Sequence, residues 1–356
     1  NGAASWPGPA PGNYPTVAHP MEFVLKTFRA ALTALAFLAF ALHPAHARAN
    51  SFADDPEVTA FIAEMQEKHG FDADWLSTRF ARLRPNETVL RAIKPAAVPE
   101  LQRSWERYRS RFLNERRIAA GARFWQQHEA DLRRASAIYG VPPEIIVAII
   151  GVETEYGQNT GKFGVMQALA TLAFRYPPRA PFFRSELEQF LLLARENEAD
   201  PLTIKGSYAG AIGIPQFMPS SQRRYAVDFD GDGKVNLSRS ATDAIGSVAS
   251  FLAQHGWETG GAVAVPASFE SDPAPLVALG IKPEKTLADL VAAGMRAEGN
   301  PAAQAAVIDL VTPDQETEYW AGFQNFYVIT RYNRSSFYAM SVFQLAEAIR
   351  ERKQAL

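Results

Sequence analysis

Residues 141–157 read VPPEIIVAIIGVETEYG, and they predict the central element of the protein. Proline is tolerated in the first turn of a helix, so Pro142 and Pro143 mark a helix start. Every residue from Ile145 to Ile150 is apolar. A helix that is apolar on all sides has no face for water, so we predict that it is buried.

Glu153 follows this apolar run by one turn. A carboxyl group there is poorly hydrated, and desolvation disfavours its charged form and raises its pKa. A raised pKa suits a general acid at neutral pH, although Glu153 could instead cap the helix or pair with an arginine. Glu155 lies ~200° further around the helix, so the two carboxyl groups cannot face one site, and one of them is expected to be solvated.

Helical patterns lie on both sides of this element. Residues 55–140 carry apolar residues at helical spacing, with one long helix predicted from Asn114 to Tyr139 and a stop at Gly140. Residues 260–309 are rich in Ala, Val, Pro and Gly, which predicts a small mixed insert with short strands. Further helices are predicted from Pro181 to Glu198, from Ala241 to His255 and from Ser341 to Lys353.

The N-terminal segment is not predicted to belong to the fold. Residues 1–20 show no apolar period and are interpreted as disordered, or as an extension upstream of a start at Met21. Residues 21–47 combine basic residues, a short apolar run and an Ala-His-Ala site, the pattern of a secretory signal peptide. The alternative is a transmembrane anchor, but spanning a bilayer takes ~20 apolar residues and this run is shorter. We therefore expect an exported, soluble protein with no membrane span after cleavage.

The composition argues against several classes of function. Lys and Arg total 36 against 38 for Asp and Glu, whereas a nucleic-acid binder usually has a basic excess. The sequence has no cysteine, which excludes disulfide scaffolds, thiol nucleophiles and iron–sulfur clusters. The six histidines form no HExxH or HxH pair, so a zinc hydrolase is not expected.

A glycine-rich segment, GSYAGAIGIPQFMPSS, occupies residues 206–221. Glycines let a backbone approach a ligand closely, and Ser207 and Gln216 can hydrogen-bond a polar ligand. The segment lacks the GKS or GKT of a phosphate loop. Taken alone, it could equally be an ordinary junction between helices.

Residues 228–236, DFDGDGKVN, resemble the start of an EF-hand loop. Asp228, Asp230 and Asp232 take loop positions 1, 3 and 5, and the backbone carbonyl of Lys234 takes position 7. The usual closing glutamate is missing, and Asp243 at the start of the next helix could replace it. The pattern predicts a structural Ca²⁺ ion, and the alternative is an Asp/Gly turn without metal.

Five motifs, in order along the chain, resemble those of the lytic murein transglycosylase B family. They are Gly151-Val152-Glu153-Thr154, residues 206–211 (GSYAGA), residues 216–221 (QFMPSS), the segment from Asp228 to Asp243, and residues 330–333 (TRYN). The resemblance runs from about residue 54 to the C-terminus.

The resemblance implies a mainly α (α+β) fold with a lysozyme-like core. The expected parts are a helical domain (54–140), the catalytic core (141–257) with its EF-hand-like loop (228–243), a small mixed insert (258–325) and a C-terminal return to the core (326–356). It also implies cleavage of the β-1,4 bond between N-acetylmuramic acid and N-acetylglucosamine in peptidoglycan, with formation of 1,6-anhydromuramyl ends.

In this family a single glutamate acts first as acid and then as base, and by position it is Glu153. The resemblance also implies calcium held in a lengthened loop closed by Asp243, a periplasmic location, glycan strands as substrate, and contacts with proteins that build or remodel the cell wall. Arg179 matches part of an Arg-Arg pair that meets the stem peptide, and its neighbour here is Pro178. Residues matching positions that line the glycan cleft are Tyr108, Ser207, Gln216, Tyr332, Asn333 and Tyr338.

Two other functions stay open at this point. The protein could be a catalytically silent peptidoglycan binder, or a hydrolytic muramidase with the same cleft. A buried acid is costly to keep, which argues against the silent binder. The masses of the products from digested cell walls distinguish all three.

Overall fold

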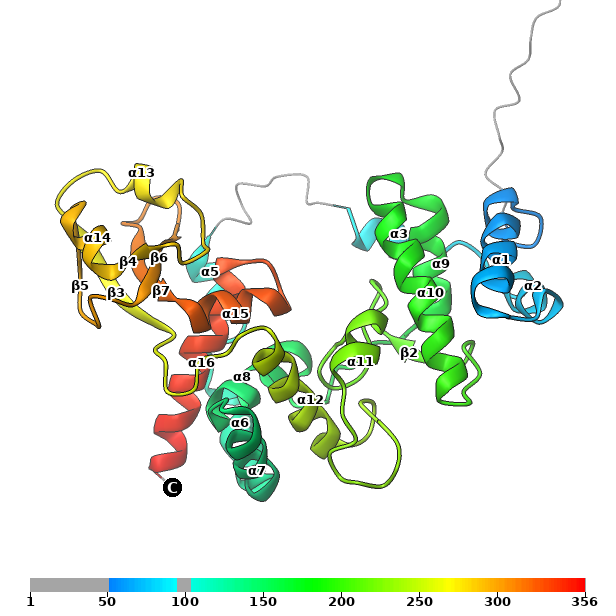
Figure 1. Ribbon diagram of the computed structural model, residues 1–356, viewed down its shortest axis with the longest axis horizontal. Helices are drawn as coiled ribbons and strands as arrows, with labels where there is room; N and C mark the ends of the chain where they lie inside the picture. Colours follow the sequence, from blue (N-terminus) through cyan, green and yellow to red (C-terminus); the bar gives the residue numbers. More distant parts are fainter. Residues whose placement is uncertain (1–50, 95–103, 356) are drawn as a thin grey trace, which may run out of the picture. The chain divides into compact units, whose positions relative to one another are not determined.

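The computed structural model describes residues 51–94 and 104–355. The predicted extension (1–20) and signal peptide (21–47) lie outside the described residues. The described part is mostly helical with two small sheets, so the prediction of a mainly α fold is confirmed (Figure 1).

The order of elements follows the chain without repeats. The helices are α1 (Pro56–His69), α2 (Ala73–Ala81), α3 (Glu87–Ala92), α5 (Trp105–Ser110), α6 (Glu115–Gln127), α7 (Glu129–Tyr139), α8 (Pro143–Thr154), α9 (Val165–Arg175), the 3₁₀ helix η1 (Pro177–Arg179), α10 (Ala180–Glu196), α11 (Pro219–Tyr225), α12 (Ala241–Gln254), α13 (Ala274–Val277), α14 (Leu287–Ala292), α15 (Gln324–Tyr332) and α16 (Ser336–Gln354). The strands are β1 (Phe163–Gly164), β2 (Lys205–Gly206), β3 (Ala264–Phe269), β4 (Lys285–Thr286), β5 (Met295–Ala297), β6 (Gln304–Leu310) and β7 (Glu318–Phe323).

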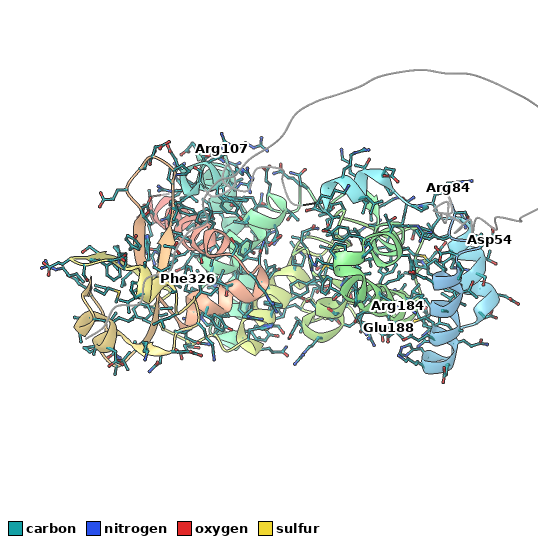
Figure 2. The ribbon with its side chains drawn as sticks, turned by 90° about the horizontal axis from the view of Figure 1, so that it is seen from above. Asp54, Arg84, Arg107, Arg184, Glu188 and Phe326 are labelled. Atoms are coloured by element: carbon teal, nitrogen blue, oxygen red, sulfur yellow. The ribbon has the colours of Figure 1, made fainter. Side chains whose placement is uncertain are left out.

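The helix α8 lies at the centre of the first apolar cluster. It begins with proline in its first turn, and its residues from Ile145 to Ile150 are at most 3% exposed, as the apolar run predicts. It contacts α6, α7, α12 and α16. Phe326 of α15, labelled in Figure 2, belongs to the same cluster. This packing fixes the end of α8 from several sides.

A second apolar cluster joins α1–α3 to α9 and α10. Phe61, Phe80 and Phe174 meet edge to face, with ring centroids 5.8–6.4 Å apart. Figure 1 shows α9 and α10 side by side, and they pack against each other. In contrast, α6 and α7 share the first cluster with α8. The helices of residues 54–140 therefore divide between the two apolar clusters.

The predicted mixed insert contains a five-stranded antiparallel sheet in the order β4-β6-β7-β3-β5. Its central pair, β6 and β7, is in register at Val307 opposite Ala321. Leu287, Leu290 and Met295 build a small third core against this sheet. The insert leads directly into α15, because β7 ends at Phe323.

Two predicted helix boundaries were wrong. The helix expected from Asn114 to Tyr139 breaks at His128, whose backbone (φ −117°, ψ 28°) leaves the helical range before α7 starts. The last helix begins at Ser336 rather than at Ser341, because the Ser335 side chain caps it by accepting from the N–H of Tyr338.

Within residues 51–94 and 104–355, no single helix is both long and apolar enough to cross a membrane. Taken together, α7 and α8 would meet that criterion, but a bend of 113° separates them.

Candidate active site and metal loop

Glu153 lies in the last turn of α8, and the residue is partly buried. Its Oε1 accepts a hydrogen bond of 2.6 Å from the hydroxyl of Tyr338. Burial raises the pKa of Glu153 from 4.5 to about 7, and the bond from Tyr338 acts in the opposite direction. This carboxyl group can therefore hold a proton near neutral pH and still reach a ligand.

Three tyrosines from three different helices surround Glu153. Tyr338 belongs to α16, Tyr332 ends α15 and Tyr108 lies on α5. The rings of Tyr332 and Tyr338 are stacked, with centroids 6.4 Å apart and an interplanar angle of 14°. Burial, followed by the charge of Glu153, raises the pKa of all three phenols. The structure thus brings together four of the predicted site residues.

Glu155 has a different environment, although it is only two residues further along. It caps α8 in the left-handed region (φ 50°), and its two oxygens accept from Arg116 at 2.5 Å and from Arg117 at 2.6 Å. Arg117 also donates at 2.7 Å to the carbonyl of Gly151, which accepts the N–H of Glu155 at 3.1 Å as well. The expectation that one of the two glutamates is simply solvated was therefore wrong, because the arginines engage Glu155.

The glycine-rich segment folds against the end of α8. The hydroxyl of Thr154 donates to the carbonyl of Ile214 at 2.8 Å. The hydroxyl of Tyr332 donates to the carbonyl of Pro215 at 2.6 Å. These two bonds place the loop beside Glu153, since Thr154 and Tyr332 both adjoin that residue.

Two predicted binding residues shape this loop internally. Gln216 takes a left-handed conformation (φ 50°), and its Nε2 donates to the carbonyls of Thr160 (3.1 Å) and Gly213 (2.9 Å). The hydroxyl of Ser207 accepts from the N–H of Ala211 at 3.0 Å. Both polar side chains therefore hold the loop, and each keeps further hydrogen-bonding capacity for a ligand.

Two other predicted residues are not joined to this group by a hydrogen bond recorded within residues 51–94 and 104–355. Asn333 is exposed, and its backbone carbonyl accepts from the N–H of Ser335. Arg179 is exposed, and its guanidinium lies over the rings of Phe182 (4.6 Å) and Phe183 (5.0 Å). Their binding roles stay predictions.

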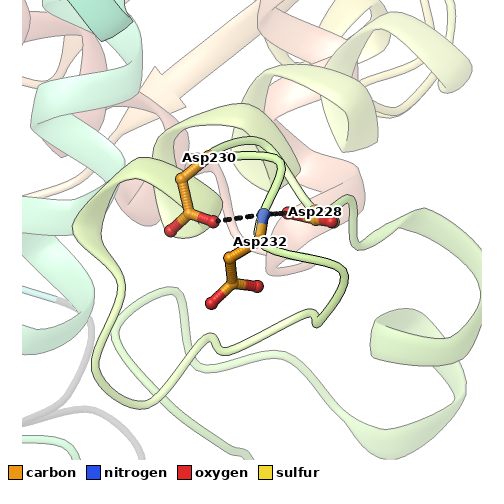
Figure 3. A group of neighbouring side chains, drawn as sticks. All are labelled: Asp228, Asp230 and Asp232. Carbon is orange, nitrogen blue, oxygen red and sulfur yellow. Dashed lines mark hydrogen bonds between the residues drawn. The ribbon is translucent and has the colours of Figure 1, made fainter.

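The acidic loop brings three carboxylates together. Asp228, Asp230 and Asp232 each offer one oxygen, and these oxygens lie within 4.8 Å of one another (Figure 3). Backbone N–H groups support the arrangement, since Asp228 accepts from Gly231 (2.8 Å) and Gly233 (2.7 Å). Three converging carboxylate oxygens are the donors that Ca²⁺ prefers, so this loop fits the predicted ion.

Asp243 does not join these three oxygens. It is fully buried, and its Oδ1 accepts from the N–H of Phe229 at 2.8 Å, while its Oδ2 accepts from the N–H of Asn236 at 2.7 Å. Asp243 therefore ties both arms of the loop to α12, and its role as a carboxylate ligand stays a prediction. Lys234 follows the acidic triplet, and its N–H donates to Asp232 at 2.8 Å.

Sequence reasoning missed the contacts of Thr154 and of the arginines on α6. Thr154 stands inside the motif GVET, but only the position of Ile214 shows what its hydroxyl bonds. Arg117 lies far from Glu155 in the chain, and a run of arginines is an ordinary pattern for an exposed helix face.

Comparisons with known proteins identify the family of this chain. The family model described as Transglycosylase SLT domain matches residues 53–347. The chain is 44% identical over 324 residues to the membrane-bound lytic murein transglycosylase B of Escherichia coli (strain K12), covering 87% of this chain and 88% of that protein.

Solved structures of lytic transglycosylases are also similar to this chain. The soluble lytic transglycosylase SltB1 of Pseudomonas aeruginosa superposes with a TM-score of 0.79 at 49% identity, covering 84% of this chain and 100% of that one. The Escherichia coli lytic transglycosylase Slt35 in complex with calcium gives a TM-score of 0.76 at 43% identity, covering 85% and 95%. These likenesses confirm the predicted lysozyme-like fold. The chain therefore belongs to the lytic murein transglycosylase B family.

Proposed function

We propose that this protein is a peptidoglycan lytic transglycosylase in which Glu153 serves as both acid and base. The substrate is the β-1,4 bond between N-acetylmuramic acid and N-acetylglucosamine. The observation that carries the proposal is the position of Glu153 at the end of the buried helix α8, where Tyr338 donates to its carboxyl group at 2.6 Å and burial raises its pKa to about 7. At neutral pH a large share of the molecules therefore holds the proton that the reaction needs.

The reaction divides into two proton transfers. Glu153 first donates its proton to the glycosidic oxygen, and the bond from that oxygen to C1 of the muramyl residue breaks. The C6 hydroxyl of the same residue then attacks C1, while the Glu153 carboxylate takes the hydroxyl proton. The products are a free 4-hydroxyl on N-acetylglucosamine and a 1,6-anhydromuramyl end, and no water is consumed.

This scheme fits a site with one carboxyl group. Hydrolytic glycosidases use a second carboxyl group at ~5–5.5 Å or ~6.5–9.5 Å from the acid. Among the described residues, burial and the Tyr338 bond account for the pKa of Glu153, and Glu155 is held by two arginines. An internal hydroxyl nucleophile makes the second carboxylate unnecessary.

The polar groups around Glu153 orient the acid, stabilise the transition state and hold the substrate. Tyr338 holds the Glu153 carboxyl group in one orientation through its 2.6 Å bond. The tyrosine oxygens and the N-acetyl group of the substrate stabilise the oxocarbenium-like stage. The sugar ring and its N-acetyl groups are held by Tyr108, Ser207, Gln216, Tyr332 and Asn333, and Arg179 meets the stem peptide.

We further propose that the acidic loop holds a structural Ca²⁺ ion. Its ligands would be the carboxylates of Asp228, Asp230 and Asp232 and the carbonyl of Lys234, with Asp243 holding the loop through backbone N–H groups. The ion neutralises the three negative charges. It takes no part in the bond exchange, because Glu153 provides both proton transfers.

The proposed substrate also indicates where in the cell the protein acts. A peptidoglycan-cleaving enzyme acts in the cell envelope, and the predicted signal peptide at residues 21–47 places it in the periplasm. Its partners there are glycan strands and proteins that build or remodel the wall.

The decisive experiment is mass spectrometry of purified cell-wall sacculi after digestion. Products lighter by one water, with anhydromuramyl ends, support the proposal. Reducing muramic ends would identify a hydrolytic muramidase instead. If binding occurs without any soluble product, the protein is a silent binder.

A further inference from the structure

Glu186 is a buried carboxyl group outside the site described above. It lies on α10 and is 5% exposed. Both of its oxygens have the same partner, since Oε2 accepts from the N–H of Ser220 at 3.0 Å and Oε1 accepts from the Ser220 hydroxyl at 2.6 Å. Burying a carboxyl group is costly unless it is hydrogen-bonded, so these two bonds hold Glu186 and Ser220 together.

Glu186 supplies a cap that α11 lacks from its own sequence. The residue before this helix is Met218, and it gives no side-chain hydrogen bond to the first turn. A helix start has N–H groups without partners, which side-chain oxygens usually satisfy. Here the oxygen comes from α10, whose buried residues belong mostly to the second apolar cluster.

The capped helix continues directly into the loop beside Glu153. Ser220 is four residues after Gln216, and the N–H and carbonyl of Phe217 pair with Ile212 at 3.1 Å and 2.8 Å. Upstream, the carbonyls of Ile214 and Pro215 accept from Thr154 and Tyr332. The loop is therefore held on one side by the Glu153 site and on the other side by Glu186.

We propose that Glu186 is a positioning residue, which fixes the start of α11 so that Gln216 and Pro215 face the site of Glu153. The inference rests on the proposed function, because the loop matters only if glycan binds beside it. Glu186 does not touch the reacting atoms. Its effect passes through Ser220 and the backbone of residues 216–219.

The test uses substitutions that remove the two bonds to different extents. Glu186→Leu removes both acceptors, so kcat/KM for peptidoglycan falls about tenfold or more, the effect expected for lost hydrogen bonds to a buried carboxyl group. Glu186→Gln keeps an acceptor for the N–H and a polar partner for the hydroxyl, so it restores most of the activity. Ser220→Ala falls between them, and adding it to Glu186→Leu causes no further loss.

Glu188 provides a matched control on the same helix. It pairs with His69 at 2.7 Å, and Figure 2 shows it beside Arg184, which binds Glu64 of α1. Glu188→Leu therefore removes a carboxyl group of α10 whose recorded partner is His69 of α1, and only its charge acts on Arg223 of α11, so kcat/KM stays within about twofold of the parent.

Two kinetic readouts separate positioning from a purely structural role. Activity is measured well below the unfolding temperature of each variant, and the larger share of the loss appears in KM, because Gln216 holds the sugar. The pH midpoint near 7 stays unchanged in Glu186→Leu, because burial and Tyr338 still set the pKa of Glu153. If Glu186→Leu fails to fold, Glu186→Gln and Ser220→Ala provide the same comparison.

A measurement of glycan affinity tests this inference independently of the proposed function. In a Glu153→Gln background, the dissociation constant for a peptide-free glycan tetrasaccharide is expected to rise about tenfold on adding Glu186→Leu. This result can be obtained even if the parent protein makes no anhydro product. The proposal would be overturned if Glu186→Leu lowered the unfolding temperature but left KM and glycan affinity unchanged. A shifted pH midpoint of activity in this variant would also overturn it.

Discussion

The end of α8 and the acidic loop both present carboxyl groups, but the two regions treat negative charge in opposite ways. Glu153 is enclosed beside tyrosines, and its pKa rises to about 7. Asp228, Asp230 and Asp232 converge at the surface, where backbone N–H groups point at their oxygens. One region favours the protonated form of its acid, and the other collects charge that a cation can neutralise.

This difference in environment explains how carboxyl groups can serve two purposes in the same protein. A proton donor needs an environment that makes its charged form costly. A cation site needs oxygens that stay charged and close together. Breaking each environment separately should therefore damage catalysis in one case and stability in the other.

The largest expected effect is the loss of activity in Glu153→Gln. Glutamine cannot donate or accept the transferred proton, so turnover of sacculi falls by a factor of at least about 10³. Affinity for soluble glycan stays close to that of the parent, because the fold and the tyrosines remain. Activity within tenfold of the parent would refute the role of Glu153, and Glu155→Gln is the matched control at the same helix end.

The second effect concerns stability and pH. Folded Glu153 binds its proton more tightly than the unfolded chain does, so the parent protein loses stability as pH rises from about 4.5 to about 7. The total loss from this group is about 3 kcal/mol. Glutamine does not titrate, so Glu153→Gln should gain about this much relative to the parent across that window. Denaturant unfolding at several pH values measures the difference, and a constant difference would contradict the assigned environment.

Calcium binding should change the free energy of unfolding by a similar or smaller amount. At a free concentration about a hundredfold above its dissociation constant, the ion stabilises the folded state by about 2–3 kcal/mol and raises the unfolding temperature by several degrees. EDTA should reverse the shift without changing the pH midpoint of activity.

Asp230→Asn serves as the control for calcium, since it removes one of the three converging charges and should abolish the shift. Direct titration by calorimetry reports binding without reference to activity. If neither calcium nor EDTA changes the unfolding temperature of the parent, the loop holds no ion.

The smallest effect is expected from Tyr338→Phe. The hydroxyl of Tyr338 stabilises the charged carboxylate, so its removal raises the pKa of Glu153 further. The alkaline fall of the pH–rate profile should move upward by about one pH unit or less, and kcat should drop because the carboxyl group loses its fixed orientation. A downward shift would contradict this reading of the bond.

The sequence predicted those parts of the fold that depend on local pattern. The apolar run from Ile145 to Ile150 is sufficient to place a buried helix, and Pro143 marks its start. The position of Glu153 one turn beyond the run already indicates a poorly hydrated acid. Likewise, the spacing of Asp228, Asp230 and Asp232 is a local property of the loop, so their convergence follows from sequence alone.

The remainder depends on contacts between distant segments. The partners of Glu155 cannot be read from its position in the sequence, because only the packing of α6 brings Arg116 and Arg117 to it. Asp243 has the spacing of a metal ligand, but in the folded protein its carboxylate is buried and accepts hydrogen bonds from two backbone N–H groups. Glu186 carries no local signal, because its partner Ser220 lies 34 residues away.

The most direct test is a titration of the Glu153 carboxyl group itself, by NMR of protein with ¹³C-labelled glutamate carboxyl carbons. One glutamate resonance should titrate with a midpoint near 7 and should be missing in Glu153→Gln. If the resonance lost in that variant titrates near 4.5 in the parent protein, Glu153 is an ordinary exposed carboxylate, and the account of this site is wrong.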